Sequence, residues 1–334
     1  MTTVSSKCLI IVGMHRSGTS FTASLLQNAG LNIGSNLLEG AIGNALGYFE
    51  NEDFLTFHKT VLTKRGDNSD GWSLRAVNTL EPEELSELQA IIKSNESEQW
   101  GWKDPRTTLF LNIYKQLLPD AIFLFVYRKP WEVIDSLFRR NTDIEFIKNA
   151  KSTCNNWLYY NQLILDFFKT NKERALLIDI ESIMNDSTTF IELLNSTFNF
   201  SLNSKPKPVF KEDQFQNNSK QIQQLLCETA FPECIDQFKI LQKESSIKPP
   251  QEYIHSDITQ DSLIEWWRYY VSIIEITKKI NPKNSDTSSI FLAIKNTECE
   301  NIALKNENKH LSNEIDWMTK SIWWKIRSYF KKFF

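Results

Sequence analysis

Gly13-Met14-His15-Arg16-Ser17-Gly18-Thr19-Ser20 is the stretch from which the expected fold follows. Residues 7–12 before it are apolar and predict a buried strand, and residues 19–29 after it predict a helix. The stretch fits the phosphate-binding frame G-x-x-x-x-G-K-S/T, except that Thr19 stands at the lysine position. Such a loop directs backbone N–H groups and the positive helix end at an anion, and Arg16 can supply the missing cation. The alternative is a glycine-bearing strand-to-helix turn of an unrelated α/β protein.

Strands and helices alternate through the first 200 residues. We expect further strands at residues 121–127 and 175–180, and helices at residues 81–93, 107–118 and 130–140. This alternation predicts an α/β, P-loop-like three-layer fold with a central parallel sheet, in a core that spans residues 1–204. Helices are expected to dominate afterwards, at residues 219–227 and 261–280. Residues 205–287 are therefore predicted to form a helical cap region, and residues 288–334 a helical tail.

Composition narrows the class of protein. The chain has 334 residues, of which 41% are hydrophobic and 24% charged, and this is the profile of a soluble globular protein. Five cysteines without a CxxC pair indicate a reducing compartment. We find no apolar run long enough to span a bilayer and no secretory signal, so a cytoplasmic location is expected. The net charge of −3 argues against nucleic acid as a partner.

Two further segments place cations at the same edge of the predicted sheet. In Trp100–Arg106, Asp104 suits a helix N-cap with a proline after it, and Lys103 and Arg106 flank that cap. Arg128 follows the strand at residues 122–127, and Ser136 comes eight residues later, so the pair can grip a phosphate. Taken singly, each segment also fits an ordinary capped helix or strand end with solvated basic residues.

The order and spacing of the three segments resemble the PAPS-dependent sulfotransferases, which use 3′-phosphoadenosine 5′-phosphosulfate as sulfuryl donor. The resemblance covers about residues 7–200. It implies that residues 16–20 form the 5′-phosphosulfate loop and that Arg128 and Ser136 bind the 3′-phosphate. No metal is required if fixed cations neutralise the leaving phosphate. Lys103 matches a lysine that assists catalysis in tyrosylprotein sulfotransferases. Residues 47–51 and 102–106 look most like bacterial sulfotransferases found beside glycan-modifying enzymes.

The function implied by this resemblance is transfer of a sulfuryl group from PAPS to a hydroxyl, on a carbohydrate acceptor. The residues expected to bind the donor are Gly13, His15, Arg16, Ser17, Gly18, Thr19, Ser20, Arg128 and Ser136. Arg16 and Lys103 are expected to stabilise the developing charge. Glu50 is the expected general base, with Glu39 and His58 as alternatives. A packed histidine is the favoured interpretation of His58, and His15 either binds the ligand or only shapes the loop.

Two other functions remain open at this level. An ATP- and Mg²⁺-dependent P-loop kinase is favoured by the frame at residues 13–20, and by Asp179 after an apolar run, which could hold Mg²⁺ together with Ser20. Thr19 at the lysine position argues against it. The third function is a non-catalytic nucleotide-binding scaffold that recruits partners through its tail.

The tail carries its own signals. Residues 319–334 contain five basic residues and no acidic one, interleaved with aromatic residues. This pattern predicts a helix that lies peripherally on an anionic membrane surface, at the inner face, or a helix docked on the protein's own core. Heptad-spaced Leu304, Leu311 and Met318 suit either self-association or a solvated single helix.

Overall fold

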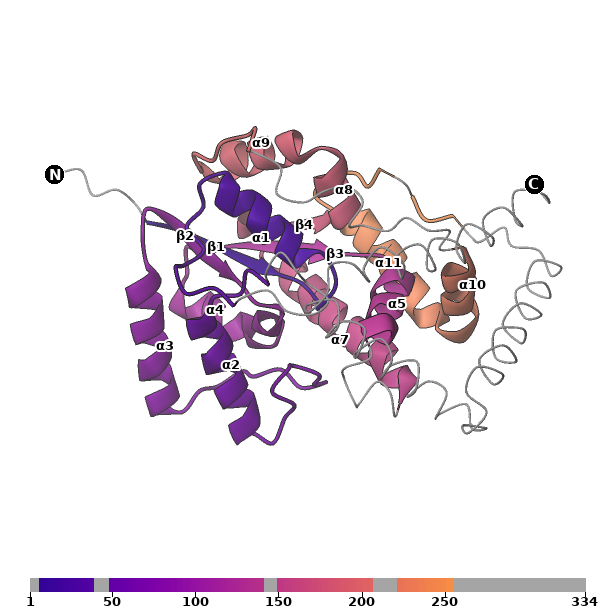
Figure 1. Cartoon of the computed structure of the whole chain (residues 1–334), viewed down its shortest axis with the longest axis horizontal. Coiled ribbons are helices and arrows are strands. Elements are labelled where there is room, and N and C mark those ends of the chain that lie inside the picture. The colour runs from indigo at the N-terminus through magenta and orange to yellow at the C-terminus, as the bar shows by residue number, and fades with distance from the viewer. Residues whose placement is uncertain (1–5, 39–47, 141–148, 207–220, 251, 255–334) are drawn as a thin grey trace, which may run out of the picture. The chain divides into compact units, whose positions relative to one another are not determined.

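Four parallel strands form the central sheet in the order β2–β1–β3–β4 (Figure 1). The strands are β1 (Lys7–Val12), β2 (Gln99–Lys103), β3 (Ile122–Tyr127) and β4 (Ala175–Asp179). The computed structural model describes residues 6–38, 48–140, 149–206, 221–250 and 252–254. All of these belong to the first of two units into which the chain divides, Met1–Ile258 and Thr259–Phe334.

Helices cover both faces of the sheet (Figure 1). One face packs against α1 (Thr19–Asn28), α8 (Ile180–Asn185) and α9 (Ser187–Phe198). The core on the other face is shared with seven helices: α2 (Glu52–Lys64), α3 (Pro82–Asn95), α4 (Leu111–Leu117), α5 (Pro130–Arg140), α7 (Ala150–Lys169), α10 (Gln221–Ala230) and α11 (Pro232–Glu244). Side chains alternate between the two cores, since Ile11 and Val126 face the first and Ile10 and Phe125 the second. Strands buried on both faces explain the continuous apolar runs, and the predicted three-layer α/β fold is confirmed.

Most predicted elements of the core are found in the structure, but residues 107–118 do not form one helix. Pro105–Phe110 is a 3₁₀ helix, η1, and α4 begins only at Leu111. The carbonyl of Leu109 accepts a hydrogen bond from the Val77 backbone N–H at 2.7 Å. That contact ties the segment to a neighbouring loop, and the regular α-helix starts after it.

Strand β2 is an edge strand that the sequence did not predict. It contains Gly101, which lies opposite Leu9 of β1. A Cβ atom at Gly101 would fall 1.8 Å from the Leu9 carbonyl oxygen, so the close approach of the two strands requires glycine. A five-residue strand interrupted by glycine carries a weak pattern.

Several predictions fall outside the described residues. These are Glu39, the helix at residues 261–280 and the tail at residues 288–334. The expected domain boundaries after residues 204 and 287 also stay predictions. Among the helices that the structure describes, none combines the length and the apolar character needed to cross a bilayer.

Candidate functional site

The loop between β1 and α1 has a backbone that its glycines make possible. Gly18 has φ +92°, and Arg16 also lies in the left-handed region with φ 69°. A non-glycine residue enters that region at a cost of about 1–2 kcal/mol, and such strain gathers at functional loops. A Cβ atom at Gly13 would lie 2.4 Å from the carbonyl oxygen of Val126 and 2.8 Å from the methyl group of Thr19. The loop is therefore pressed against the carboxyl end of β3.

The same loop offers donors to an anion. The first N–H groups of α1 have no acceptors within the helix, and the N-cap Gly18 has no side chain to satisfy them. The hydroxyl of Ser17 is buried and has no hydrogen-bond partner among the described residues. A buried hydroxyl without a partner is costly, and an anion held by the loop would supply its acceptor.

Arg16 joins this loop to the end of β3 and to α5. Its Nε donates to the Oγ of Ser136 at 2.8 Å, and its carbonyl oxygen accepts from Nη1 of Arg128 at 3.2 Å. The three polar groups that the sequence assigned to one anionic ligand therefore lie side by side. Arg128 also donates to Glu132 Oε2 at 2.6 Å, a pairing between residues four apart that the sequence reasoning did not anticipate.

Lys103 and Glu50 form a buried ion pair beside the loop. Nζ of Lys103 donates to Oε1 of Glu50 at 2.8 Å, and the side chains are 1% and 7% exposed. Lys103 ends β2 opposite Ile11 of β1, so its position is fixed by the sheet register. Burial lowers the pKa of Lys103, and the neighbouring Glu50 carboxylate opposes that effect.

Arg106 is the centre of a second layer of charges around Glu50. Its Nη1 lies 2.9 Å from Asp104 Oδ1 and 3.5 Å from Glu50 Oε2, and its Nη2 lies 3.3 Å from Asp70 Oδ1. Burial opposes the charge of Arg106, but the carboxylates of Asp104 and Glu50 outweigh it and raise its pKa. Asp104 also caps η1 by accepting from the Arg106 backbone N–H at 3.0 Å, as predicted for this segment.

His58 belongs to the support of this cluster. Its Nδ1 lies 2.7 Å from Asp104 Oδ2 and its Nε2 lies 2.8 Å from the Tyr114 hydroxyl, and the residue is fully buried. Both ring nitrogens are therefore occupied, so the geometry gives His58 no position from which to take a proton from an acceptor. The packed interpretation of this histidine agrees with these contacts. Burial works against the charge of Asp104, yet Arg106 and His58 hold its pKa below the ordinary value.

A segment around Gly71 packs against Arg106 and His15. The His15 ring lies 4.4 Å from the ring of Trp72, centroid to centroid, and His15 is buried. The Tyr160 hydroxyl donates to the Gly71 carbonyl at 2.7 Å. With φ +87° and a Cβ position 3.0 Å from Arg106 Cγ, Gly71 admits no larger residue without strain. His15 packs against Trp72 in this cluster. Trp72 and Tyr160 were not visible as site residues in the sequence because nothing local marks them.

The residues that favoured a kinase each make a hydrogen bond within the chain. Ser20 Oγ donates to the Tyr48 carbonyl oxygen at 3.1 Å, and Asp179 accepts from the Glu181 backbone N–H at 2.8 Å as the N-cap of α8. Asp179 ends β4, and β3 lies between β4 and β1 in the sheet. Within the described residues, no group of three or more histidine, cysteine or acidic side chains is arranged to hold a metal ion.

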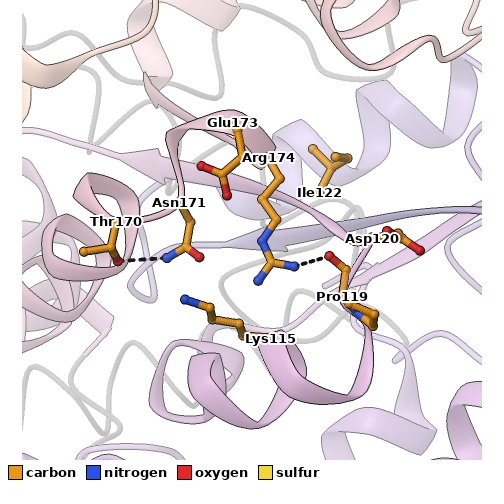
Figure 2. Close-up of a pocket in the computed structure, with 8 residues that line it drawn as sticks. All are labelled: Lys115, Pro119, Asp120, Ile122, Thr170, Asn171, Glu173 and Arg174. Atoms are coloured by element: carbon orange, nitrogen blue, oxygen red, sulfur yellow. Dashed lines mark hydrogen bonds between the residues drawn. The ribbon is translucent and has the colours of Figure 1, made fainter.

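A cavity of about 640 Å³ lies at the opposite edge of the sheet (Figure 2). Ile122, the first residue of β3, lines it, and so does Arg174, which immediately precedes β4. Arg174 donates to the Pro119 carbonyl oxygen and Asn171 to Thr170, as the dashed lines in Figure 2 mark. The cavity is separate from the loop, because it lies at the amino ends of β3 and β4 and the loop follows the carboxyl end of β1. Ligands of open α/β sheets bind at the carboxyl ends of the strands.

No family model and no curated protein matches the chain. Among solved structures, it is similar to the sulfotransferase domain from the curacin biosynthetic pathway, with 16% identity over 63% of this chain and 77% of that chain and a TM-score of 0.39. A sulfotransferase from Mycobacterium avium gives 15% identity over 58% and 64% of the two chains, with a TM-score of 0.40. The sulfotransferase domain from the Synechococcus PCC 7002 olefin synthase is 15% identical over 79% of this chain and 94% of that chain, with a TM-score of 0.36.

Proposed function

We propose that this chain is a sulfotransferase that moves the sulfuryl group of PAPS to a hydroxyl of an acceptor. The observation that carries the proposal is the contact of Arg16 with both Ser136 and Arg128. A ligand with two anionic ends needs two anion sites on one edge of one sheet. The loop at residues 13–20 provides one, and Arg128 with Ser136 provides the other. A nucleotide without a 3′-phosphate would use only the first.

The loop residues fit the 5′ end of such a donor. The N–H groups at the start of α1 have no acceptors within the helix, and the buried Ser17 hydroxyl has no hydrogen-bond partner among the described residues. Together they would hold a phosphate without help from a lysine, which explains how Thr19 is tolerated at the usual lysine position. PAPS supplies a sulfuryl group that is already electrophilic, so the protein's task is positioning and charge stabilisation.

We propose that the cations Arg16 and Lys103 stabilise the negative charge that develops during sulfuryl transfer. Fixed cations in a buried site stabilise such charge without reorganising during the reaction. The lowered pKa of Lys103 follows from burial, and the anion of the donor would add a second negative partner for its ammonium group. A metal ion is not needed in this arrangement.

Glu50 is the general base that we propose. Its carboxylate is held from two directions, by Lys103 at 2.8 Å and by Arg106 at 3.5 Å. Arg106 is in turn fixed by Asp104, and Asp104 by His58. We assign Arg106, Asp104 and His58 as positioning residues that fix where Glu50 receives the hydroxyl proton.

The acceptor that we propose is a carbohydrate, on the resemblance of residues 47–51 and 102–106 to bacterial sulfotransferases of that kind. A cytoplasmic location, contact of residues 319–334 with a membrane surface, and self-association through the tail remain proposals from sequence. Nucleic acid is not a proposed partner.

The direct test is turnover of PAPS labelled in its sulfur, with a mixture of oligosaccharides as acceptors. Wild type should transfer label to the acceptor, and Arg16→Ala should lose at least about 100-fold in turnover because it removes a charge-assisted contact at the reacting group. Arg75→Ala, an exposed arginine paired with Asp67, is the control that should keep wild-type activity. Equal activity of wild type and Arg16→Ala would contradict the proposal.

A further inference from the structure

Three of the cysteines lie close together where α7, α10 and α11 meet. Cys154 lies on α7, Cys227 on α10 and Cys234 on α11, and all three are buried. Cys154 and Cys234 are 80 positions apart in the sequence, yet their sulfur atoms lie 2.8 Å from each other. Among the described cysteines, Cys8 on β1 lies outside this group and serves as its natural control. Sequence spacing gave no sign of the cluster.

The sulfur atoms of Cys154 and Cys234 are in direct contact. Their separation of 2.8 Å exceeds the disulfide bond length of about 2.05 Å by less than 1 Å. Helices α7 and α11 pack directly on one another, so a small shift of either side chain closes the gap without moving a distant element. Disulfide geometry is demanding, and the short distance between the two sulfur atoms meets one of its requirements.

We propose that Cys154 and Cys234 are a reversible disulfide site that a low-molecular-weight disulfide such as oxidised glutathione converts. One thiolate attacks the oxidant and forms a mixed disulfide, which releases the first glutathione thiol. The second thiolate then attacks the protein sulfur of that mixed disulfide, forms the Cys154–Cys234 bond and releases the second glutathione thiol. Two electrons pass to the oxidant, and the two protons end on the released thiols.

The reaction is expected to be slow in the folded protein. Hydrogen bonding with Cys154 and Cys227, together with burial, raises the pKa of the Cys234 thiol. A protonated, buried thiol is a weak nucleophile, so α10 and α11 must separate from α7 before the oxidant can reach the pair. We therefore expect conversion over hours, faster at higher pH.

The bond would hold α11, which packs against the elements that carry the proposed 3′-phosphate site. Phe238 of α11 packs edge-on against Trp131 of α5 at 5.6 Å and against Tyr127 at the end of β3 at 6.1 Å. Arg128 and Ser136 belong to that same strand end and helix. A cross-link from α11 to α7 closes a long loop, which stabilises the folded state against unfolding. The proposal does not depend on the function assigned above.

The test uses the full chain incubated with oxidised or reduced glutathione, then denatured, alkylated and analysed by peptide mass spectrometry. We expect a cross-linked peptide pair containing Cys154 and Cys234, a melting temperature raised by several degrees, and reversal of both by dithiothreitol. Cys8→Ser and Cys227→Ser should keep the cross-link, and Cys154→Ser should lose it.

Three outcomes would overturn the proposal. The first is full alkylation of Cys154 and Cys234 after prolonged oxidation of the wild type, which needs no variant to fold. The second is a stable glutathione adduct on either residue with no cross-link between them. The third is a cross-link of Cys234 to Cys227 in place of Cys154.

Discussion

Arg16 Nε donates a hydrogen bond to Ser136 Oγ at 2.8 Å, although 120 positions separate the two residues. One residue belongs to the strained loop after β1 and the other to the second turn of α5. The contact exists because β1 and β3 are neighbours in the sheet and both end at the same edge. It makes the two proposed anion sites parts of one surface.

The Arg16–Ser136 contact predicts that the two residues act together on the donor. Ser136→Ala should weaken binding of PAP, the desulfated product, about 5-fold, and Arg16→Ala about 10- to 100-fold. Calorimetry on the double variant should give less than the product of the single losses, because contacting residues are not additive. Fully multiplicative losses would mean that the two residues meet the ligand independently.

Substitution of Glu132 is expected to strengthen PAP binding instead of weakening it. Its carboxylate holds Arg128 Nε at 2.6 Å, and both side chains are largely buried. A 3′-phosphate has to compete with that carboxylate for the same guanidinium group. Glu132→Gln should therefore bind PAP about 3- to 10-fold more tightly, since it removes a competing negative charge.

The matched control for this variant is Glu173→Gln, the same change of charge beside the cavity at the opposite edge (Figure 2). It should leave PAP affinity unchanged. Weaker PAP binding by Glu132→Gln would show that Glu132 orients Arg128 for the ligand instead of competing with it.

Much of this fold could be predicted because its strands are buried on both faces. Uninterrupted apolar runs gave β1, β3 and β4, and the glycine-bearing loop fixed the first strand-to-helix connection. The edge strand β2 was not predicted, because Gly101 and the charged Lys103 at its end interrupt the apolar run. Local periodicity also gave no reason to break residues 107–118, since the contact with Val77 that ends η1 comes from a distant loop.

The site was predictable where a motif is local and hidden where it is made of distant contacts. Residues 13–20 and the cap at Asp104 follow from short-range chemistry. The pairing of Glu50 with Lys103 joins positions 53 apart, and no rule of spacing gives it. Trp72 and Tyr160 reach the cluster only through packing of the chain around Gly71.

Glu50→Gln is expected to separate chemistry from binding. Removal of a general base should lower turnover of PAPS about 10²- to 10⁴-fold, while PAP affinity stays near wild type. Glu52→Gln, two residues along in the first turn of α2, is the control that should keep its activity. If Glu39→Gln loses turnover and Glu50→Gln does not, the base assignment moves to Glu39.

Asp179 predicts a pH dependence of stability. Burial raises its pKa to about 7 from the ordinary 3.8. Between these values the folded protein keeps a proton that the unfolded chain has released, so the free energy of unfolding falls as pH rises. Asp179→Asn cannot titrate, but its amide oxygen still accepts from the Glu181 N–H. Its stability relative to wild type should therefore grow by on the order of 2–4 kcal/mol from about pH 4 to about pH 7.

Urea denaturation across that range measures the difference. Asp186→Asn is the control, because Asp186 is an exposed N-cap whose pKa is lowered, chiefly by its hydrogen bonds to Thr189. That variant should show no gain in relative stability with rising pH. A constant difference between Asp179→Asn and wild type would mean that Asp179 is ionised in the folded state throughout.

Binding of PAP in the presence of EDTA tests the central claim most directly. Thermal unfolding of the wild type should shift upward with PAP, and less with AMP, which lacks the 3′-phosphate. At 100 times the dissociation constant the stabilisation should be about 2.7 kcal/mol. Arg128→Ala should remove the advantage of PAP over AMP. Stabilisation by ADP with Mg²⁺ and none by PAP would contradict the sulfotransferase assignment and favour a kinase.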